Sequence, residues 1–252
     1  TNDQDDIVDA VVAGNKAYFL TNIWGGTAAP PITRVACRDL TTATGDDCFP
    51  AFGGVQTWGA TAAGPRTAAY GQRLACDSRY GLFVAARVMN NTRGQEVGIA
   101  RISADDGSLI TEFKDGGYNI GLPNWAPATG AEVAVNVLTV TPAGNPGGIR
   151  VYVAGQMNRN ATDHDGFVLG LAPTNGILTS GWNWNNQSYY YEGDNIGTKK
   201  DAITALTVLR NGKIVFAGWS ESDSANVRPM MMGRINNDGS IDAGFCADNT
   251  NA

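Results

Sequence analysis

Internal repetition is the feature of this sequence that most limits what it can fold into. The clearest copy of the repeat begins at Asp201 and reads DAITALTVLRNGKIVFAGW, then, after a polar loop, PMMMGRINNDGSIDAGF up to Phe245. Each half contains two short apolar runs joined by a turn, with Gly212 in the first turn and Gly239 in the second. Glycine turns between apolar runs are typical of β-hairpins, so this copy predicts four antiparallel strands.

Three landmarks place four such copies along the 252 residues, with a period of 62 to 69 residues. The second strands read AYFL (17–20), FVAA (83–86), VYVA (151–154) and IVFA (214–217). The turn glycines are Gly45, Gly107, Gly176 and Gly239, and the closing aromatic residues are Phe49, Phe113, Trp182 and Phe245. A repeat of this length indicates a propeller or a solenoid.

A single four-stranded sheet leaves its apolar faces in water, whereas sheets repeated around an axis cover one another. We therefore expect an all-β chain, a four-repeat β-propeller with four-stranded antiparallel blades, closed by itself or part of a larger ring or assembly. Residues 1–252 then form one domain, with blades at about 5–52, 66–116, 130–183 and 200–246. A linear β-solenoid is the alternative, although its repeats are normally shorter than about 45 residues.

The second copy, GIARISADDGSLITEF (98–113), shares a longer pattern with the fourth. Both resemble the delta-60 repeat β-propeller family, whose units read D-x-A-x-A-x-x-x-x-G-K-I-x-x-A-G, a variable loop, then L-x-R-x-x-x-D-G-S-x-D-x-x-F. The first copy departs from this pattern, with DLTTATGDDCF in place of the D-G-S turn, and the third has Gly170 where the others have arginine. The resemblance implies a propeller fold and a bacterial surface or secreted scaffold, and it implies no particular reaction.

Composition narrows the possible partners. The chain has 24 acidic and 18 basic residues, hence a net charge of −6 and a pI near 4.7. A surface that follows phosphates needs an excess of positive charge, so we expect no nucleic-acid partner. No apolar run approaches the roughly 20 residues that cross a bilayer, so no transmembrane segment is expected.

The four cysteines contain no CxxC pair, which favours disulfides over zinc and an oxidising location: secreted, periplasmic or cell surface. Cys37 and Cys48 flank the turn between the third and fourth strands of the first copy, and we predict that they form a disulfide. Cys76 lies in the first strand of the second copy and Cys246 at the end of the fourth, and their pairing stays open.

Arginines recur at one position of the repeat, at Arg34, Arg101 and Arg234, each followed by Val or Ile. We expect each to pair locally and fix a turn of its blade. The alternative is that they line a channel or bind a carboxylate.

A short loop, NRNATDHDGF, offers oxygen ligands for a hard cation such as calcium from Asn160, Asp163 and Asp165. It lacks the full spacing of a calcium loop, so an ordinary hairpin loop is the alternative. No other cofactor is expected. His164, the only histidine, lies in the same loop, and we expect it to be solvent-exposed and without a catalytic role.

The segment GWNWNNQSYYYEGDN (181–195) concentrates flat aromatic side chains among amides: Trp182, Trp184, Tyr189, Tyr190 and Tyr191. Such a set suits stacking on sugar rings or anchoring a protein partner. The alternative is that these residues form core between blades.

These observations predict a secreted or cell-surface β-propeller that binds a carbohydrate or protein partner and has no catalytic residues. Two other functions remain open. One is a structural building block of a surface polymer or complex, with self-assembly. The other is a hydrolase or lyase with its site in a central channel, which would require clustered acids and a metal.

Overall fold

The computed structural model describes residues 4–24, 32–49, 66–90, 94–114, 118–122, 132–146, 148–158, 164–177, 189–191, 200–221 and 228–245. Within these ranges the chain consists of β-strands and turns and contains no helix. No segment among them therefore meets the requirement for a membrane-spanning helix. The expected all-β class is confirmed.

The strands form four antiparallel sheets, one for each copy of the repeat. Sheet 1 contains β1 (Gln4–Ala13), β2 (Lys16–Trp24) and β3 (Ile32–Asp39). Sheet 2 contains β4 (Arg66–Asp77), β5 (Gly81–Asn90), β6 (Gly94–Ile102) and β7 (Tyr118–Leu122). Sheet 3 contains β8 (Val133–Val140), β9 (Val151–Asn158), β10 (His164–Leu171) and β11 (Tyr189–Tyr191). Sheet 4 contains β12 (Asp201–Val208), β13 (Ile214–Ser220) and β14 (Met230–Ile235).

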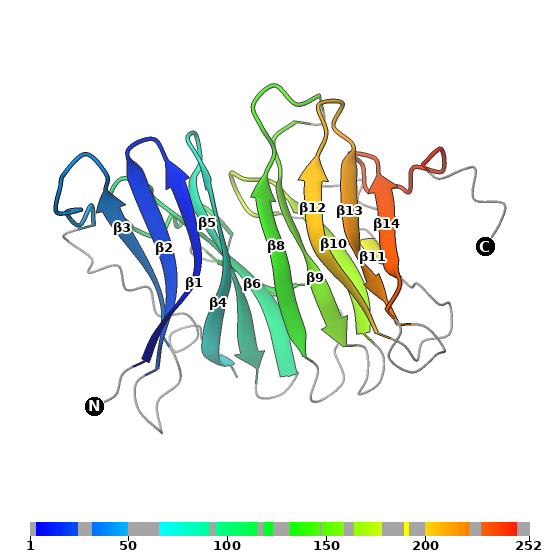
Figure 1. Cartoon of the computed structure of the whole chain (residues 1–252), viewed down its shortest axis with the longest axis horizontal. Coiled ribbons are helices and arrows are strands. Elements are labelled where there is room, and N and C mark those ends of the chain that lie inside the picture. Colours follow the sequence, from blue (N-terminus) through cyan, green and yellow to red (C-terminus); the bar gives the residue numbers. More distant parts are fainter. Residues whose placement is uncertain are drawn as a thin grey trace.

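The four sheets stand in a row, in the order of the sequence (Figure 1). The first strand of each sheet packs against its neighbours: β1 contacts β4, β4 contacts β8, and β8 contacts β12. Sheet 1 and sheet 4 lie at opposite ends of the long axis, so the described sheets form an open row and not a closed ring. The sheets stack in the order of the repeats, but the described sheets do not close into a ring.

The fourth strand of each copy differs from the expectation. We expected it directly after the turn glycine, but that segment forms only a single bridge, Arg38 to Asp47, Ile102 to Leu109, and Ile235 to Ile241. In sheets 2 and 3 the strand that completes the sheet comes later, at β7 and β11. The segment after the turn instead brings the closing aromatic residue back over the sheet.

Strand register corrects the alignment of the copies. The backbone N–H of Cys48 donates to the Cys37 carbonyl, as Ile110 does to Arg101 and Asp242 does to Arg234. Cys37 therefore occupies the repeat position of Arg101 and Arg234, and Arg34, which pairs with Thr21, does not. The same register places Leu82 in line with Val151 and Ile214, so the second strand of copy two is offset by one residue from the expected FVAA segment.

Each sheet has two faces, which we name by their neighbours. The leading face lies toward the following sheet and the trailing face toward the preceding one. Tyr18 and Leu20 belong to the leading face of sheet 1 and pack against Leu82 and Val84 on the trailing face of sheet 2. These side chains are at most 2% exposed, and burial of each contributes about 1.5–3 kcal/mol.

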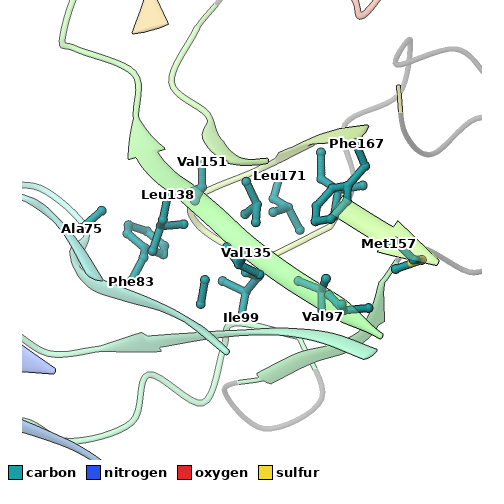
Figure 2. Close-up of a cluster of buried hydrophobic side chains, with 14 of the residues drawn as sticks. Ala75, Phe83, Val97, Ile99, Val135, Leu138, Val151, Met157, Phe167 and Leu171 are labelled. Carbon is teal, nitrogen blue, oxygen red and sulfur yellow. The ribbon is translucent and has the colours of Figure 1, made fainter. Parts of the chain in front are cut away.

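The largest cluster lies between sheets 2 and 3 (Figure 2). Phe83 and Ile99 on the leading face of sheet 2 meet Val135 and Leu171 of sheet 3. The cluster between sheets 3 and 4 follows the same rule, with Tyr152 against Phe216. All three junctions thus join a leading face to a trailing face.

The closing aromatic residues connect consecutive copies. A Cβ placed on Gly107 would lie 3.0 Å from the ring of Phe49, and one on Gly176 would lie 2.8 Å from the ring of Phe113. Both glycines have positive φ, at 78° and 66°, which glycine adopts at least cost. Each aromatic ring is therefore covered by the turn glycine of the following copy.

Candidate functional site

The predicted aromatic surface is mostly beyond the described residues. Trp182 and Trp184 lie outside them. Tyr189–Tyr191 form β11, the edge strand of sheet 3, which pairs with β10. The stacking surface therefore stays a prediction.

The predicted calcium loop is only partly described. Asn160 and Asp163 lie outside the described residues. Asp165 is not in the loop: it lies within β10, opposite Met157, and is 1% exposed. The strand begins earlier than expected because His164 already pairs with Asn158. Among the described side chains, no group of three or more His, Cys, Asp or Glu is placed to bind a metal ion.

His164 is buried, so the expectation of an exposed histidine is wrong. It is 8% exposed and forms a bridge with Lys200 at the start of sheet 4. Burial, and then the nearby Lys200 ammonium, lowers the pKa of His164 below its ordinary value. The packing of sheet 4 onto β10 accounts for the difference from the expected loop position.

The predicted disulfide between Cys37 and Cys48 is confirmed, with a Cα–Cα distance of 5.1 Å. Cys76 lies in the first strand of sheet 2, as expected, and is a free, half-buried thiol. Burial, and then Asp77, raises the pKa of Cys76. Cys246 lies outside the described residues.

Two of the three recurrent arginines fix their own turns, as expected. Arg101 Nε donates to the Tyr80 carbonyl at 2.6 Å, and its guanidinium lies 5.4 Å from the Tyr80 ring. Arg234 Nε donates to Asp242 Oδ2 at 2.6 Å and lies over the ring of Phe245. Arg34 lies three residues before the equivalent position, so its assignment to this set is wrong.

The described site best suited to a ligand is a polar pocket of about 300 Å³ where sheets 1, 2 and 3 meet, which we call the junction pocket. It lies beside the first strands β1, β4 and β8. Its lining residues are Val8, Asn22, Tyr70, Gly71, Gln72, Arg73, Arg87, Val135 and Asn136.

Repeated β-bulges form the floor of this pocket. Each first strand shifts register at an equivalent residue, Val8, Gln72, Asn136 or Thr204, and these are spaced 64, 64 and 68 residues apart. Strand β4 has a second shift near its start, between Arg66 and Ala68. A bulge bends its strand and redirects a side chain. Gln72 Oε1 accepts from the Val135 N–H at 2.7 Å, and Asn136 Nδ2 donates to the Ile203 carbonyl at 2.9 Å. The bulged residues thus connect sheet 2 to sheet 3 and sheet 3 to sheet 4.

A buried polar group closes the side of the pocket at sheet 1. Asn22 is 8% exposed and both donates to the Gly71 carbonyl and accepts from the Gly71 N–H, at 3.1 and 2.9 Å. Thr33 Oγ1 donates to the Ala69 carbonyl at 3.0 Å. A Cβ on Gly71 would lie 2.8 Å from Thr33 Cγ2, so the close approach of β4 to sheet 1 requires glycine here.

Positive charge distinguishes the junction pocket from the acidic chain around it. The Nε of Arg73 already has a partner within the protein, because it donates to the Asn136 carbonyl at 2.6 Å. Arg87 lies 4.6 Å from the centre of the Tyr70 ring. Its Nε is buried and has no hydrogen-bond partner among the described residues. A buried donor of this kind favours a ligand with a carboxylate or hydroxyl oxygen.

This pocket was not predicted from the sequence. Arg87 interrupts the apolar run GLFVAARVMN of the second strand, and a charged residue in such a run is the one signal that points to it. The bulges carry no signal in the sequence pattern, since Val8, Gln72, Asn136 and Thr204 share no chemistry.

Comparison with known family models, curated proteins and solved structures finds no match for this chain.

Proposed function

We propose that this chain is a secreted or cell-surface recognition module of the β-propeller kind, which binds an acidic glycan at the junction pocket and catalyses no reaction. The observation that carries the proposal is the half-buried Arg87, with an unpaired Nε beside Tyr70 in a polar pocket. Guanidinium groups bind carboxylates through charge-assisted hydrogen bonds, and aromatic rings stack on sugars.

The Cys37–Cys48 disulfide supports the location, because disulfides persist in oxidising compartments. The pocket supports a small polar ligand segment, because fixed sheets preorganise it: its floor and sides are held by hydrogen bonds between sheets. Preorganised sites lose less entropy on binding.

Calorimetric titration with an oligomer of galacturonic acid tests the proposal, with a neutral hexose oligomer of the same length as the ligand control. We expect binding of the acidic oligomer, weakened at least about tenfold by Arg87→Met, which removes the charge and keeps the apolar stem. Arg210→Met is the matched control, since Arg210 is exposed at the turn between β12 and β13, and should bind as the parent does.

Absence of binding, or equal binding by Arg87→Met and Arg210→Met, would contradict the proposal. If binding is instead lost in Trp184→Ala with Tyr190→Ala, the ligand site is the predicted aromatic surface and not the junction pocket.

A structural building block is the second candidate function. The observation that favours it is the exposed apolar surface on both end sheets, with Ile7 68% and Met230 79% exposed. No observation favours a channel-site hydrolase or lyase, because the open row of described sheets encloses no central channel.

A further inference from the structure

The two ends of the row expose the same two faces that meet inside it. Sheet 1 has no preceding sheet among the described residues, so its trailing face is exposed. Sheet 4 has no following sheet among them, so its leading face is exposed (Figure 1). Repeat arrays normally end in a polar capping face, because an apolar one associates or aggregates.

The trailing face of sheet 1 exposes apolar side chains, with Arg34 and Arg38 among them. Strand register aligns Phe19 with Val84, Val153 and Phe216, which are at most 2% exposed, whereas Phe19 is only half-buried. Ile7 and Val12 on β1 are 68% and 64% exposed. A shallow hollow of about 440 Å³ crosses this face, lined by Ile7, Phe19, Thr21, Arg34, Ala36 and Arg38.

The leading face of sheet 4 also exposes apolar side chains, with Arg234 opposite Val215 on the same face. Val215 aligns with Tyr18, Phe83 and Tyr152, which are at most 2% exposed, whereas Val215 is only half-buried. Beside it, Met232 pairs with Ala217, and Met230 pairs with Trp219. Met230 is 79% and Met232 50% exposed.

The turn at one end of the row and the closing ring at the other are also complementary, in the same direction as the two exposed faces. Gly107 and Gly176 each cover the closing aromatic ring of the preceding copy, but a Cβ on Gly45 would meet nothing within 4 Å. At the other end Phe245 is half-buried and lies under Arg234, 4.7 Å from its guanidinium. One end therefore offers an uncovered glycine turn and the other offers an uncovered closing ring.

We propose that a second copy of this chain docks head to tail, with the leading face of its sheet 4 on the trailing face of sheet 1. We choose a second copy as the partner because all three internal junctions already join a leading face to a trailing face in this direction. A single head-to-tail contact covers both exposed faces. Such heterologous contacts form closed rings when the rotation closes, and open filaments when it does not.

Sedimentation velocity over a wide range of protein concentration tests the inference. The parent chain should associate, and the sedimenting species will distinguish a ring of fixed size from a growing series. Ile7→Glu on the trailing face and Met232→Glu on the leading face should each weaken association at least about tenfold, because a carboxylate in place of an apolar side chain would lose its hydration within the contact. Ile177→Glu is the matched control, since Ile177 is 53% exposed at a turn away from both faces, and should associate as the parent does.

Mixing the two variants decides whether the contact is head to tail. The Ile7→Glu chain keeps an intact leading face and the Met232→Glu chain keeps an intact trailing face, so an equimolar mixture should form heterodimers although neither variant associates alone. Thermal melts of each variant check that the fold is retained.

A parent chain that stays monomeric at all concentrations would overturn the inference. So would association that is lost with Ile7→Glu but kept with Met232→Glu, because it would indicate a symmetric contact between two trailing faces. A mixture that remains monomeric would do the same. None of these results depends on glycan binding at Arg87, so the inference and the proposed function fail separately.

Discussion

Sheet 1 and sheet 4 hold the same position of the repeat with different chemistry. In sheet 1, Cys37 on the third strand is joined to Cys48 after the turn by a disulfide. In sheet 4, Arg234 is joined to Asp242 by an ion pair of 2.6 Å, and Lys213 adds a second contact of 2.6 Å. The backbone hydrogen bond across the turn is the same in both. The two end sheets therefore share a cross-link at this position but not its chemistry.

The two sheets also differ in their neighbours along the row. Phe49 closes sheet 1 and is 1% exposed, because Gly107 of the next copy covers it. Phe245 closes sheet 4 and remains half-buried. The same repeat position thus belongs to the core when another sheet comes after it, and to the surface when none does.

The largest expected effect comes from removing the ring of Phe49, and removing Phe245 is its comparison. Phe49→Ala should lower the free energy of unfolding by about 3–5 kcal/mol, because it leaves a cavity between sheets 1 and 2. Phe245→Ala should cost only about 0.5–1 kcal/mol, the contribution of its contact with Arg234. Urea denaturation measures both. Equal losses would show that the position of the sheet in the row does not matter.

Loss of the Cys37–Cys48 disulfide should have the next largest effect on the free energy of unfolding. Replacing Cys37 and Cys48 by Ser should lower the free energy of unfolding by about 3 kcal/mol, because the closed loop of 11 residues gains freedom in the unfolded chain. Hydrogen exchange measures where the loss falls: a reductant should reduce protection in β1–β3 and leave β12–β14 unchanged. Loss of protection in both sheets would contradict a local cross-link.

Substitutions of two turn glycines compare a turn that covers an aromatic ring with a turn that covers none. Gly107→Ala and Gly45→Ala both place alanine at positive φ, 78° and 60°, which costs about 1–2 kcal/mol. Only Gly107→Ala also brings a Cβ within 3.0 Å of Phe49, so its loss in thermal or urea unfolding should be greater by about 1–2 kcal/mol. If the two variants lose the same amount, the ring is not held by the following turn.

The smallest effect depends on pH. The Lys213 ammonium, and then Arg234, holds the pKa of Asp242 below its ordinary value. Asp242 therefore contributes stability that is present above its unfolded pKa of about 3.9 and is lost as pH falls through its folded pKa. Asp242→Asn should abolish this part of the acid transition without changing the response to reductant. An acid transition identical to that of the parent would rule out the ion pair as the cross-link of sheet 4.

The sequence predicts the elements that depend on local chemistry. Turn glycines and apolar runs identified four copies and their hairpins, and two cysteines flanking a turn identified the disulfide. The alignment of Arg34 was wrong because the first turn is longer: 11 residues separate Cys37 from Cys48, whereas Arg234 and Asp242 are 8 residues apart. Arg34 was matched because it is an arginine followed by Val, as Arg101 and Arg234 are followed by Ile, and that local pattern does not reveal the longer turn.

The junction pocket depends on tertiary structure. It forms where three sheets meet and is lined by Asn22 of sheet 1, Arg87 of sheet 2 and Asn136 of sheet 3. His164 was expected to be exposed because it was placed in a loop, and its burial depends on the packing of sheet 4 near Lys200. Neither the pocket nor the burial of His164 can be predicted from a single copy of the repeat, because both depend on packing between sheets.

Transfer of the cross-link tests most directly whether sheets 1 and 4 are copies of one unit. In a chain with both Arg234→Cys and Asp242→Cys, oxidised and analysed by peptide mapping and mass spectrometry, we expect a disulfide between positions 234 and 242, with Cys37 still joined to Cys48. Free thiols at both new positions, or pairing of either with Cys76, would contradict the equivalence on which the fold, the pocket and the head-to-tail contact all rest.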